Sequence, residues 1–492
     1  MMRRFVMIAL ALASSAGAQQ PTRPDSIDPR ARVVPHDRSV FGPDPNYGTP
    51  VYDYQAQLDI YGAKHLNRTQ RPLLELGRDL YSYGTFDRAP TPLGAHNILI
   101  PQLLVFGDLR SAAGQNTLGS VDAGRWANRL NLDLDLKLTA TERVHALFRP
   151  LEDNGKFTGM DFTGDSTSFK ARSNGEPAAL FFEGDLGAIL GGLSGRDAPF
   201  DMPIAAGLMP LLFHNGIWIE DAFTGGAFTI PAKNSRGLGW SNFDITFFYG
   251  GDKLSNPFVG DGKDHGQIGG VNMFVDAYNG YVEAGYAYIL GADKGGRDYN
   301  SVALSFTRRY AGLVSNSIRY IGAFGGAGGT PGKAGDANGH LVILENSLIS
   351  SHPLSVVPYL NLFAGFDTPI SAARDKGAGG ILKNVGLNFE GDAITGFPSL
   401  DPSGRDAVGG ALGLELLGSS LSHQLVLEVA TVYPTTPSPN LLGTQYAGGV
   451  RIQQPLTNGL ILRLDGMIGK RGGLAPGLDD IRGVRVELRQ KF

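Results

Sequence analysis

This sequence has no cysteine, few charged residues and no long apolar run. It has no Cys, only 18% of its residues are charged, and its longest apolar run is Phe5–Ala13. Without cysteine the chain can form neither a disulfide nor a thiolate site. A membrane-spanning helix needs about 20 consecutive apolar residues. The 43 Lys and Arg residues are outnumbered by 47 Asp and Glu residues, so no positive field attracts a polyanion. These absences exclude a disulfide-stapled domain, a helical membrane protein and a nucleic-acid partner.

Glycine and aromatic residues are abundant instead. The chain of 492 residues contains 69 Gly, about twice the usual share, together with 26 Phe and 17 Tyr. Disordered or fibrous chains are poor in such aromatic residues. The composition therefore indicates a folded protein that differs from an ordinary soluble domain.

The first 18 residues have the order of a secretory signal peptide. Arg3 and Arg4 precede the apolar run, which is followed by the small residues Ser14–Ala18. We expect residues 1–18 to be removed and the mature chain to be exported. Residues 19–96 then form a periplasmic tail, with seven prolines before residue 51. In this tail, Ala56–Leu66 and Leu73–Tyr81 are expected to form one or two short helices.

From Asn97 onward the hydrophobic pattern has a period of two. In Arg129–Leu138 every even position is Leu and every odd position is polar or charged. Only a β-strand separates these two sets onto opposite faces. Arg143–Arg149 alternates in the same way after the turn Thr139–Glu142. The two segments predict an antiparallel hairpin, and similar alternation recurs to the last residue.

This repetition predicts an all-β fold of about 18 strands, with sixteen as the alternative count. A soluble sandwich of this length would normally split into domains, whereas a transmembrane barrel absorbs hundreds of residues in one domain. We expect residues 97–492 to form a transmembrane antiparallel β-barrel with both ends in the periplasm. Its first strand is expected at Asn97–Leu109, with external loops from there to Gly124 and at Asp153–Gly175.

Three connections fit the barrel pattern less well. Gly187–Met202 and Pro231–Ser241 are long for the side of the short turns, and Asp367–Asp406 spans 40 residues without an expected strand. These connections are the reason for the alternative count of sixteen.

The last strand carries a resemblance to a known class. Val484, Val486, Leu488 and Phe492 share one face of Gly483–Phe492, with charged residues on the other. This segment resembles the terminal strand of Gram-negative outer-membrane proteins. The resemblance implies that these four residues are a signal for the barrel-assembly machinery, from which Gln490 departs, because an apolar or aromatic residue is usual there.

A weaker resemblance concerns the type of barrel. The expected count of eighteen and the segment Ala205–Leu208, leading into Asp221–Phe228, resemble the alginate-export and substrate-selective porins. This resemblance implies an outer-membrane location and a channel for small hydrophilic solutes, without identifying the solute.

Motifs for catalysis or metal binding are absent or incomplete. Gly328–Lys333 approaches a phosphate-binding loop, but Ala327 and Ala334 replace required residues. No His-Glu-x-x-His motif and no Gly-x-Ser-x-Gly elbow occurs. Gly260–His265 is the best oxygen-rich cluster for binding calcium, and its alternative interpretation is a solvated loop tip. We expect no enzyme, no cofactor and no metal site.

The polar faces of the strands supply the candidate functional residues. If the apolar faces contact lipid, these polar faces line the lumen. Fixed charges of both signs act there on permeating ions, unless they only pair across strands. The expected pore-lining residues are Asp133, Asp135, Lys137, Arg143, His145, Arg149, Glu283, Glu415, Glu428, Arg451, Arg463, Asp465, Arg485, Glu487 and Arg489.

A second candidate site is the segment Phe213–Asp221. His214, Asn215, Trp218, Glu220 and Asp221 could form a constriction if this loop folds inward, and otherwise Trp218 belongs to the aromatic girdle.

The function that fits these features is an outer-membrane porin-like channel for passive or selective diffusion of small hydrophilic solutes. The alternatives are an enzyme embedded in the barrel and a plugged structural or adhesive barrel. The expected partners are outer-membrane lipid, the barrel-assembly machinery and a small solute, as a monomer or a homotrimer.

Overall fold

A computed structural model describes residues 55, 71–77, 97, 99–164, 166–256, 258, 260–261, 266–291, 298–326, 337–349, 355–418, 423–436, 443–473 and 479–492. The expected signal peptide, most of the tail, the expected helix at Ala56–Leu66, the glycine-rich Gly328–Lys333 and most of Gly260–His265 lie outside these residues. No helix in the described ranges is long and apolar enough to cross a membrane.

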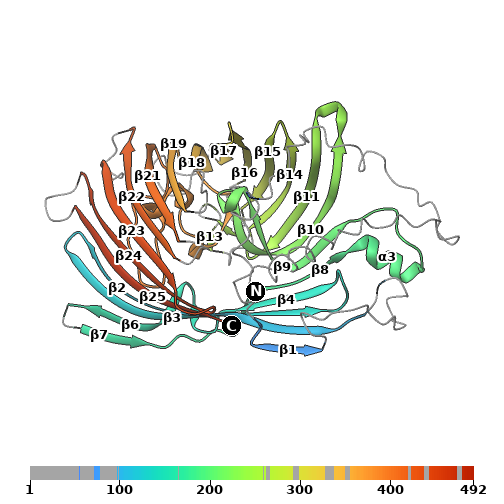
Figure 1. Cartoon of the computed structure of the whole chain (residues 1–492), viewed down its shortest axis with the longest axis horizontal. Helices are drawn as coiled ribbons and strands as arrows, with labels where there is room; N and C mark the ends of the chain where they lie inside the picture. The colour runs from blue at the N-terminus through green and yellow to red at the C-terminus, as the bar shows by residue number, and fades with distance from the viewer. Residues whose placement is uncertain are drawn as a thin grey trace, which may run out of the picture. The chain divides into compact units, whose positions relative to one another are not determined.

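Eighteen strands of the described chain form one closed antiparallel barrel, as the alternating pattern predicts (Figure 1). Each strand pairs with the next, and the last strand pairs with the first from Asp108↔Lys491 to Leu118↔Ile481. The strands are β2 (Gln102–Leu118), β3 (Val121–Lys137), β4 (Arg143–Phe148), β8 (Pro177–Asp185), β9 (Pro203–Phe213), β10 (Ile219–Ser235), β11 (Trp240–Asp252), β14 (Gln267–Ala277), β15 (Gly280–Leu290), β16 (Tyr299–Tyr310), β17 (Val314–Gly326), β18 (Ala337–Leu348), β19 (Val356–Asp367), β21 (Ala407–Leu417), β22 (Gln424–Pro434), β23 (Gln445–Pro455), β24 (Leu460–Arg471) and β25 (Asp480–Lys491).

Of the two expected external loops near the start of the barrel, the first is wrong, whereas the second belongs to the long connection between β4 and β8 and contains its own hairpin. Arg110–Gly124 belongs to the long strands β2 and β3, which are joined by a turn at 119–120. Ser111–Gly114 are small residues, so the alternation of large apolar side chains that signals a strand is missing there. Within Asp153–Gly175, β6 (Lys156–Thr163) and β7 (Ser166–Lys170) form a hairpin, and β6 also pairs with β3.

The expected helix at Leu73–Tyr81 is also wrong where the structure describes it. Leu74–Gly77 is a strand, β1, that pairs with β2 from Leu74↔Val105 to Gly77↔Gln102. This part of β2 lies beyond the end of β25, so it offers a free edge that a neighbouring strand can satisfy. The pairing of β1 with β2 therefore outweighs the helical spacing of Leu73, Leu76 and Leu80 in the sequence.

The end of the barrel where β2 begins carries both short and long connections. At the end where β2 begins and β25 ends, four turns are short, at 138–142, 278–279, 311–313 and 456–459. The supposed long connection Pro231–Ser241 is largely strand, because β10 continues to Ser235 before the 3-10 turn η3 (Arg236–Leu238). Residues 186–202 do form a long connection, and they contain the helix α3 (Leu186–Ser194), capped by Asp185.

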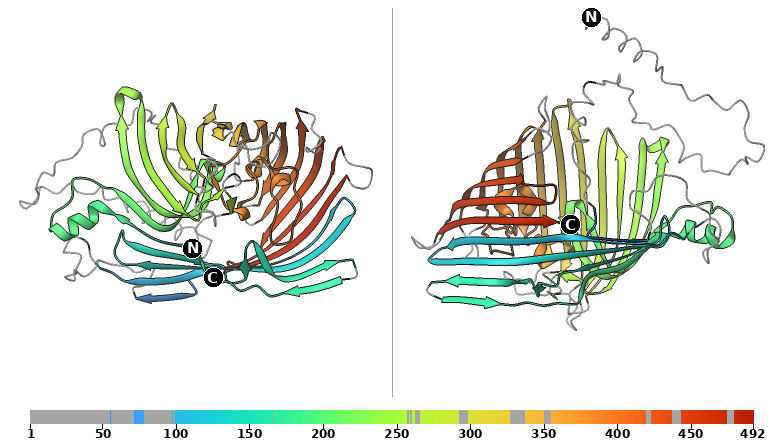
Figure 2. Two further views of the ribbon diagram at one scale, coloured as in Figure 1. Left: turned by 180° about the vertical axis from the view of Figure 1, so that it is seen from behind. Right: turned by 60° about the horizontal axis from the view of Figure 1, so that its bottom comes forward.

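The connection between β19 and β21 fills part of the barrel interior. It contains β20 (Ala373–Arg374) and the 3-10 turns η4 (Lys376–Ala378), η5 (Lys383–Val385) and η6 (Leu387–Phe389). In Figure 2 this segment, drawn in orange, lies within the ring of strands. Leu382, Phe389 and Leu400 are fully buried in a core that includes wall residues such as Ile343 and Ala411. We call residues 368–406 the inward loop.

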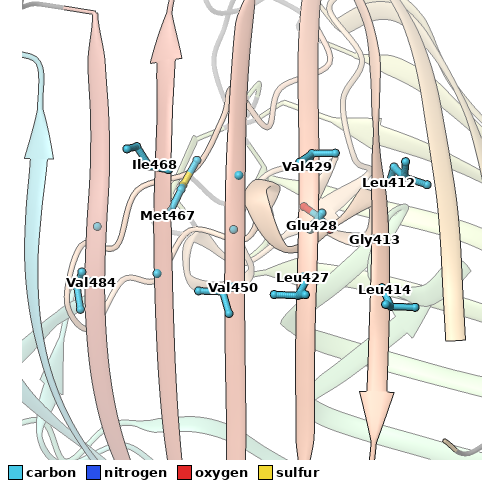
Figure 3. A pocket seen from close by; sticks show the side chains of 14 residues that line it. Leu412, Gly413, Leu414, Leu427, Glu428, Val429, Val450, Met467, Ile468 and Val484 are labelled. Carbon is cyan, nitrogen blue, oxygen red and sulfur yellow. The ribbon is translucent and has the colours of Figure 1, made fainter. Parts of the chain in front are cut away.

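The register separates the wall into a polar inner face and an apolar outer face. Directly opposed residues on paired strands share a face. Glu428, Arg451 and Arg485 contact the inward loop, so their face is the inner one. The opposite face carries exposed large apolar residues of the same strands, such as Val429 and Val484 (Figure 3). The barrel therefore has an apolar exterior and a polar interior, which is the reverse of a soluble protein and is typical of a membrane-spanning barrel.

Candidate functional site

Glu428 on β22 anchors the inward loop to the wall. Its carboxylate accepts hydrogen bonds from the backbone N–H groups of Leu387 and Asn388, both at 2.7 Å, and from the Asn388 side chain at 2.8 Å. The hydroxyl of Tyr359 on β19 donates to the same carboxylate at 2.6 Å. Because Glu428 is only 4% exposed, these donors replace the water that a buried carboxylate loses. Strand β22 thus fixes the position of η6.

Arginines of β23 and β25 hold the next part of the inward loop. Arg451 binds Glu390 at 2.7 Å and Arg485 binds Asp392 at 2.9 Å. Both guanidinium groups also bind Asp465 on β24, at 2.7 and 2.9 Å. Burial raises the pKa of Asp392, but Arg485 and the hydrogen bonds from Thr395 outweigh burial, so the net pKa lies below its ordinary value. Asp392 therefore stays ionised and attached to the wall.

Arg374 joins the inward loop to the turn between β9 and β10. This guanidinium donates to the carbonyl oxygens of Gly216 at 2.5 Å, Gly379 at 2.6 Å and Gly380 at 2.9 Å. Lys383 of η5 binds Glu220 at 2.5 Å, which adds an ion pair across the same junction. The turn at 214–218 and the inward loop therefore form one connected structure inside the barrel.

Two adjoining cavities remain between the inward loop and the wall. One has about 410 Å³ and the other about 310 Å³. The two cavities adjoin each other, because both are lined by Glu152, Asn154, Gly155, Lys376 and Gly377. Strands β2, β3, β24 and β25 contribute to the wall of the larger cavity through Arg110, Arg129, Arg463 and Arg485.

Basic side chains predominate in the larger cavity. Six basic residues line this cavity, together with the three acidic residues Glu152, Glu390 and Asp392. The basic residues are Arg110, Arg129, Lys376, Lys383, Arg463 and Arg485. Part of this positive charge is neutralised by neighbouring carboxylates, as in the pair Arg110–Glu487 at 2.7 Å. The smaller cavity adds Arg149 together with the acids Glu176 and Asp375. Charges of both signs therefore line the two adjoining cavities, with basic groups in excess in the larger one.

The register shows where the fifteen sequence-predicted wall residues lie. Asp135 and His145 are opposed, as are Lys137 and Arg143. On the other side of the barrel, Arg485 is opposed to Asp465, which is opposed to Arg451. The register also places seven other members of the set on the inner face: Asp133, Glu283, Glu415, Glu428, Arg463, Glu487 and Arg489. Arg149 directly follows the last residue of β4.

Many of these residues are buried in ion pairs instead of facing open space. Asp465, Arg485 and Glu487 are at most 3% exposed. Arg489 binds Asp108 at 2.9 Å, and Arg143 lies 3.6 Å from Asp135. Only Arg149, Arg463 and Arg485 of the fifteen line the two cavities described above. That the whole set lines a conducting pore stays a prediction.

The segment Phe213–Asp221 lies inside the barrel, with Trp218 and His214 fully buried. The Trp218 indole N–H donates to the Ser301 hydroxyl on β16 at 2.9 Å. Asp221 accepts from the Ser255 backbone N–H at 2.6 Å. Asn215 accepts from the Asn384 side chain through its carbonyl oxygen. Two of the five candidate constriction residues contact residues that line the larger cavity: Glu220 binds Lys383, and Asn215 accepts from Asn384.

Burial also determines the protonation state of His214. Neither ring nitrogen has a hydrogen-bond partner within the described ranges, and the closest carboxylate oxygen, on Glu283, is 3.7 Å away. Burial lowers the pKa of His214 to about 3, and the nearby Arg319 guanidinium adds to this effect. The imidazole is therefore neutral at physiological pH.

Sequence reasoning missed most of the charged residues that line the cavities. Arg110 and Arg129 are opposed on β2 and β3, and the alternation of Arg129–Leu138 already placed Arg129 on the polar face. Lys376, Lys383, Glu390 and Asp392 lie in the inward loop, where no periodic signal marks them. Their role depends on the contacts of the folded loop.

The other predictions have less support from the site. Val484, Val486 and Leu488 lie on the outer face of β25, and Phe492 continues the ladder by exchanging backbone hydrogen bonds with Gly107. Their role in assembly stays a prediction. No group of three or more His, Asp or Glu side chains within the described ranges is arranged to hold a metal ion.

Comparisons with known proteins reveal similarity only in three dimensions. No protein-family model matches the chain, and no curated protein sequence is similar to it. A BenF-like porin from Pseudomonas fluorescens matches with a TM-score of 0.53 and 11% identity, over 79% of this chain and 98% of that one. Pseudomonas aeruginosa OccK2 (OpdF), solved in complex with glucuronate, matches with a TM-score of 0.50 and 10% identity, over 79% and 98%. OccK7 (OpdD) of the same species matches with a TM-score of 0.50, 11% identity and the same coverage. The chain therefore has the fold of these porins.

Proposed function

We propose that this protein is a porin-like channel of the bacterial outer membrane through which small hydrophilic solutes diffuse. The observation that carries the proposal is the closed barrel with an apolar outer face and a charged interior that retains two adjoining cavities. An apolar band outside and a polar lumen inside are the features of a water-filled transmembrane barrel. The similarity in fold to solved porins supports the same conclusion.

The passage runs between the inward loop and the wall formed by β2, β3, β24 and β25. A solute in the larger cavity meets Arg110, Arg129 and Lys376 at close range. Fixed charges act strongly on ions in a narrow passage. The excess of basic groups in the larger cavity favours small anions there, and the acidic groups keep this preference moderate.

Planar-bilayer recording of the purified mature chain tests the proposal. Stepwise conductance with a reversal potential displaced toward anions is expected in a gradient of dilute salt. The double variant Arg129→Gln/Lys376→Gln removes two cavity charges and should reduce that displacement. Lys170→Gln is the matched control, because it removes the same kind of charge from β7, where Lys170 binds Asp161. Absence of any stepwise conductance from correctly folded protein would overturn the proposal.

The inward loop makes a plugged barrel the second candidate. Residues 368–406 occupy part of the interior and are tied to the wall at Glu428, Arg451 and Arg485. In a plugged barrel, current would appear only when these ties are removed. Recording from the unmodified chain and from the triple variant Glu428→Gln/Arg451→Gln/Arg485→Gln, which removes all three ties, distinguishes this arrangement from an open channel.

A further inference from the structure

The seam where the last strand meets the first is incomplete at the end of the barrel that holds the carboxyl terminus. Strand β25 pairs with β2 only as far as Asp108, and Phe492 then exchanges backbone hydrogen bonds with Gly107, at 2.8 and 3.1 Å. Residues Gln102–Phe106 of β2 extend past Phe492 and pair on their other edge with β3. Without a further neighbour, their second edge would present unpaired N–H and C=O groups, which form a template for another strand.

Strand β1 occupies this edge and continues the track of β25. Its pairing with β2 starts at Leu74↔Val105, close to the contact between Gly107 and the carboxyl terminus. Both β1 and β25 are antiparallel to β2, so the two strands point in the same direction. In Figure 1, β1 is drawn in blue and begins beside the carboxyl terminus. One strand of the wall is therefore assembled from two segments that are far apart in the sequence.

The residues of β1 also fit the two faces of the wall. Leu74 and Leu76 are opposed to outward residues of β2 and are 43% and 51% exposed, as expected of an outer face. Glu75 lies on the inner face by register, and its side chain is only 14% exposed. Gly77 ends the strand with a φ of +86°, and a Cβ there would lie 2.4 Å from the carbonyl oxygen of Pro101. The sequence of β1 therefore matches this edge both in its alternation and at its last residue.

We propose that β1 acts as a seam clamp, which adds the missing part of the last strand to the edge of β2 and keeps a second chain from pairing there. Residues 78–101 join the clamp to this edge within one chain. Such a tether gives an effective concentration on the order of millimolar, which favours β1 over a second copy in dilute solution. Release of β1 would leave the edge at Gln102–Val105 unpaired. The clamp therefore determines whether the seam is closed at this end, and its action does not depend on conduction through the interior.

A disulfide between β1 and β2 tests the position of the clamp. The chain has no cysteine, so Leu76→Cys/Leu103→Cys introduces a single possible pair. These residues are directly opposed, and opposed Cα atoms are about 4.5–5.5 Å apart, a distance that a disulfide spans. Leu76→Cys/Val105→Cys is the matched control. Val105 is diagonal to Leu76, and diagonal neighbours are about 7–8 Å apart, which is too far for a disulfide.

Mild oxidation of the full mature chain in detergent, followed by mass spectrometry of its peptides, measures the bridged fraction. Non-reducing gel electrophoresis separates bridges within one molecule from bridges between two. We expect a disulfide within most molecules of Leu76→Cys/Leu103→Cys and in only a small fraction of the control. Equal bridging in the two variants, or none in either, would overturn the proposal. Disulfides between two molecules would also overturn it, because they would show that a second copy occupies this edge.

Release of the clamp tests its effect on the seam. Successive residues of a strand direct their N–H groups to opposite edges, so Glu75→Pro/Leu76→Pro removes one N–H group that faces β2. Hydrogen exchange at Gln102–Val105 should become about tenfold faster, the factor for one lost net hydrogen bond, while Asp108–Leu118 stays protected. Glu75→Ala/Leu76→Ala is the matched control, because it keeps both N–H groups and should retain the protection.

Unchanged exchange at Gln102–Val105 in the proline variant would overturn the proposal. If the proline variant does not fold, the cysteine pairs decide the question, because they leave the backbone of β1 able to pair.

Discussion

Replacing Glu428 by Gln should loosen the inward loop without altering the shape of the side chain. The carboxylate accepts from the backbone N–H groups of Leu387 and Asn388, from the Asn388 side chain and from Tyr359. An amide has one oxygen, so its NH2 group must oppose one of these donors. Tyr359 can reverse its hydroxyl and accept, but the Leu387 N–H cannot. One buried donor therefore loses its partner, along with the charge that strengthened the other bonds.

An unsatisfied buried donor costs about 1–3 kcal/mol. The ion pairs Arg451–Glu390 and Arg485–Asp392 are the same in both proteins, so this cost raises the population of the released loop by about 5- to 150-fold. Because the loop narrows the interior, its release should add larger and noisier substates to single-channel currents. It should also make residues 368–406 more sensitive to protease added on the extracellular side.

Glu415→Gln is the matched control for this experiment. Glu415 lies on the inner face of the neighbouring strand β21 and accepts from Gln424, not from the inward loop. It should leave both the current noise and the protease sensitivity unchanged. If Glu428→Gln behaves in the same way as Glu415→Gln, the anchoring of the inward loop by Glu428 is refuted.

Three further predictions concern stability and assembly. Leu134→Arg places a charge on the outer face and should destabilise the barrel by about 2–4 kcal/mol if Leu134 lies near the bilayer midplane. Asp133→Asn on the inner face should change little, and equal urea midpoints for the two variants in lipid vesicles would contradict this assignment of the faces. His214 has its pKa lowered from 6.5 to about 3 by burial, so between these values the unfolded chain binds a proton that the folded chain does not, and stability falls as the pH falls. The free energy of unfolding should be about 2 kcal/mol lower at pH 5 than at pH 7.5. The variant His214→Phe should not show this decrease. The same dependence of stability on pH in both proteins would exclude His214 as the cause. Deletion of Phe492 should lower the amount of heat-modifiable folded barrel in the outer membrane without reducing export, and normal folded levels would show that the terminal aromatic is dispensable for assembly.

The alternation of side chains was sufficient to predict the class of fold. A period of two has only one regular conformation that separates its two sets, so Arg129–Leu138 could be assigned to a strand with its leucines on one face. The same argument placed Asp133, Arg463 and Arg485 on the polar face, and repetition of the pattern yielded the eighteen strands. Where side chains are small, as at Ser111–Gly114, the pattern disappears and the strand was missed.

Which charges meet, and where space remains, was decided only by the tertiary structure. Alternation assigns Arg485 to the inner face but contains no information about Asp392, which lies 93 residues away in an aperiodic loop. The burial of Trp218 against β16 depends in the same way on a contact across the interior. The segment around Leu76 has helical spacing in sequence, and it is a strand only because the edge of β2 beyond Phe492 offers it a partner. Local periodicity determines the face of each residue, whereas loop closure and strand register determine its neighbours.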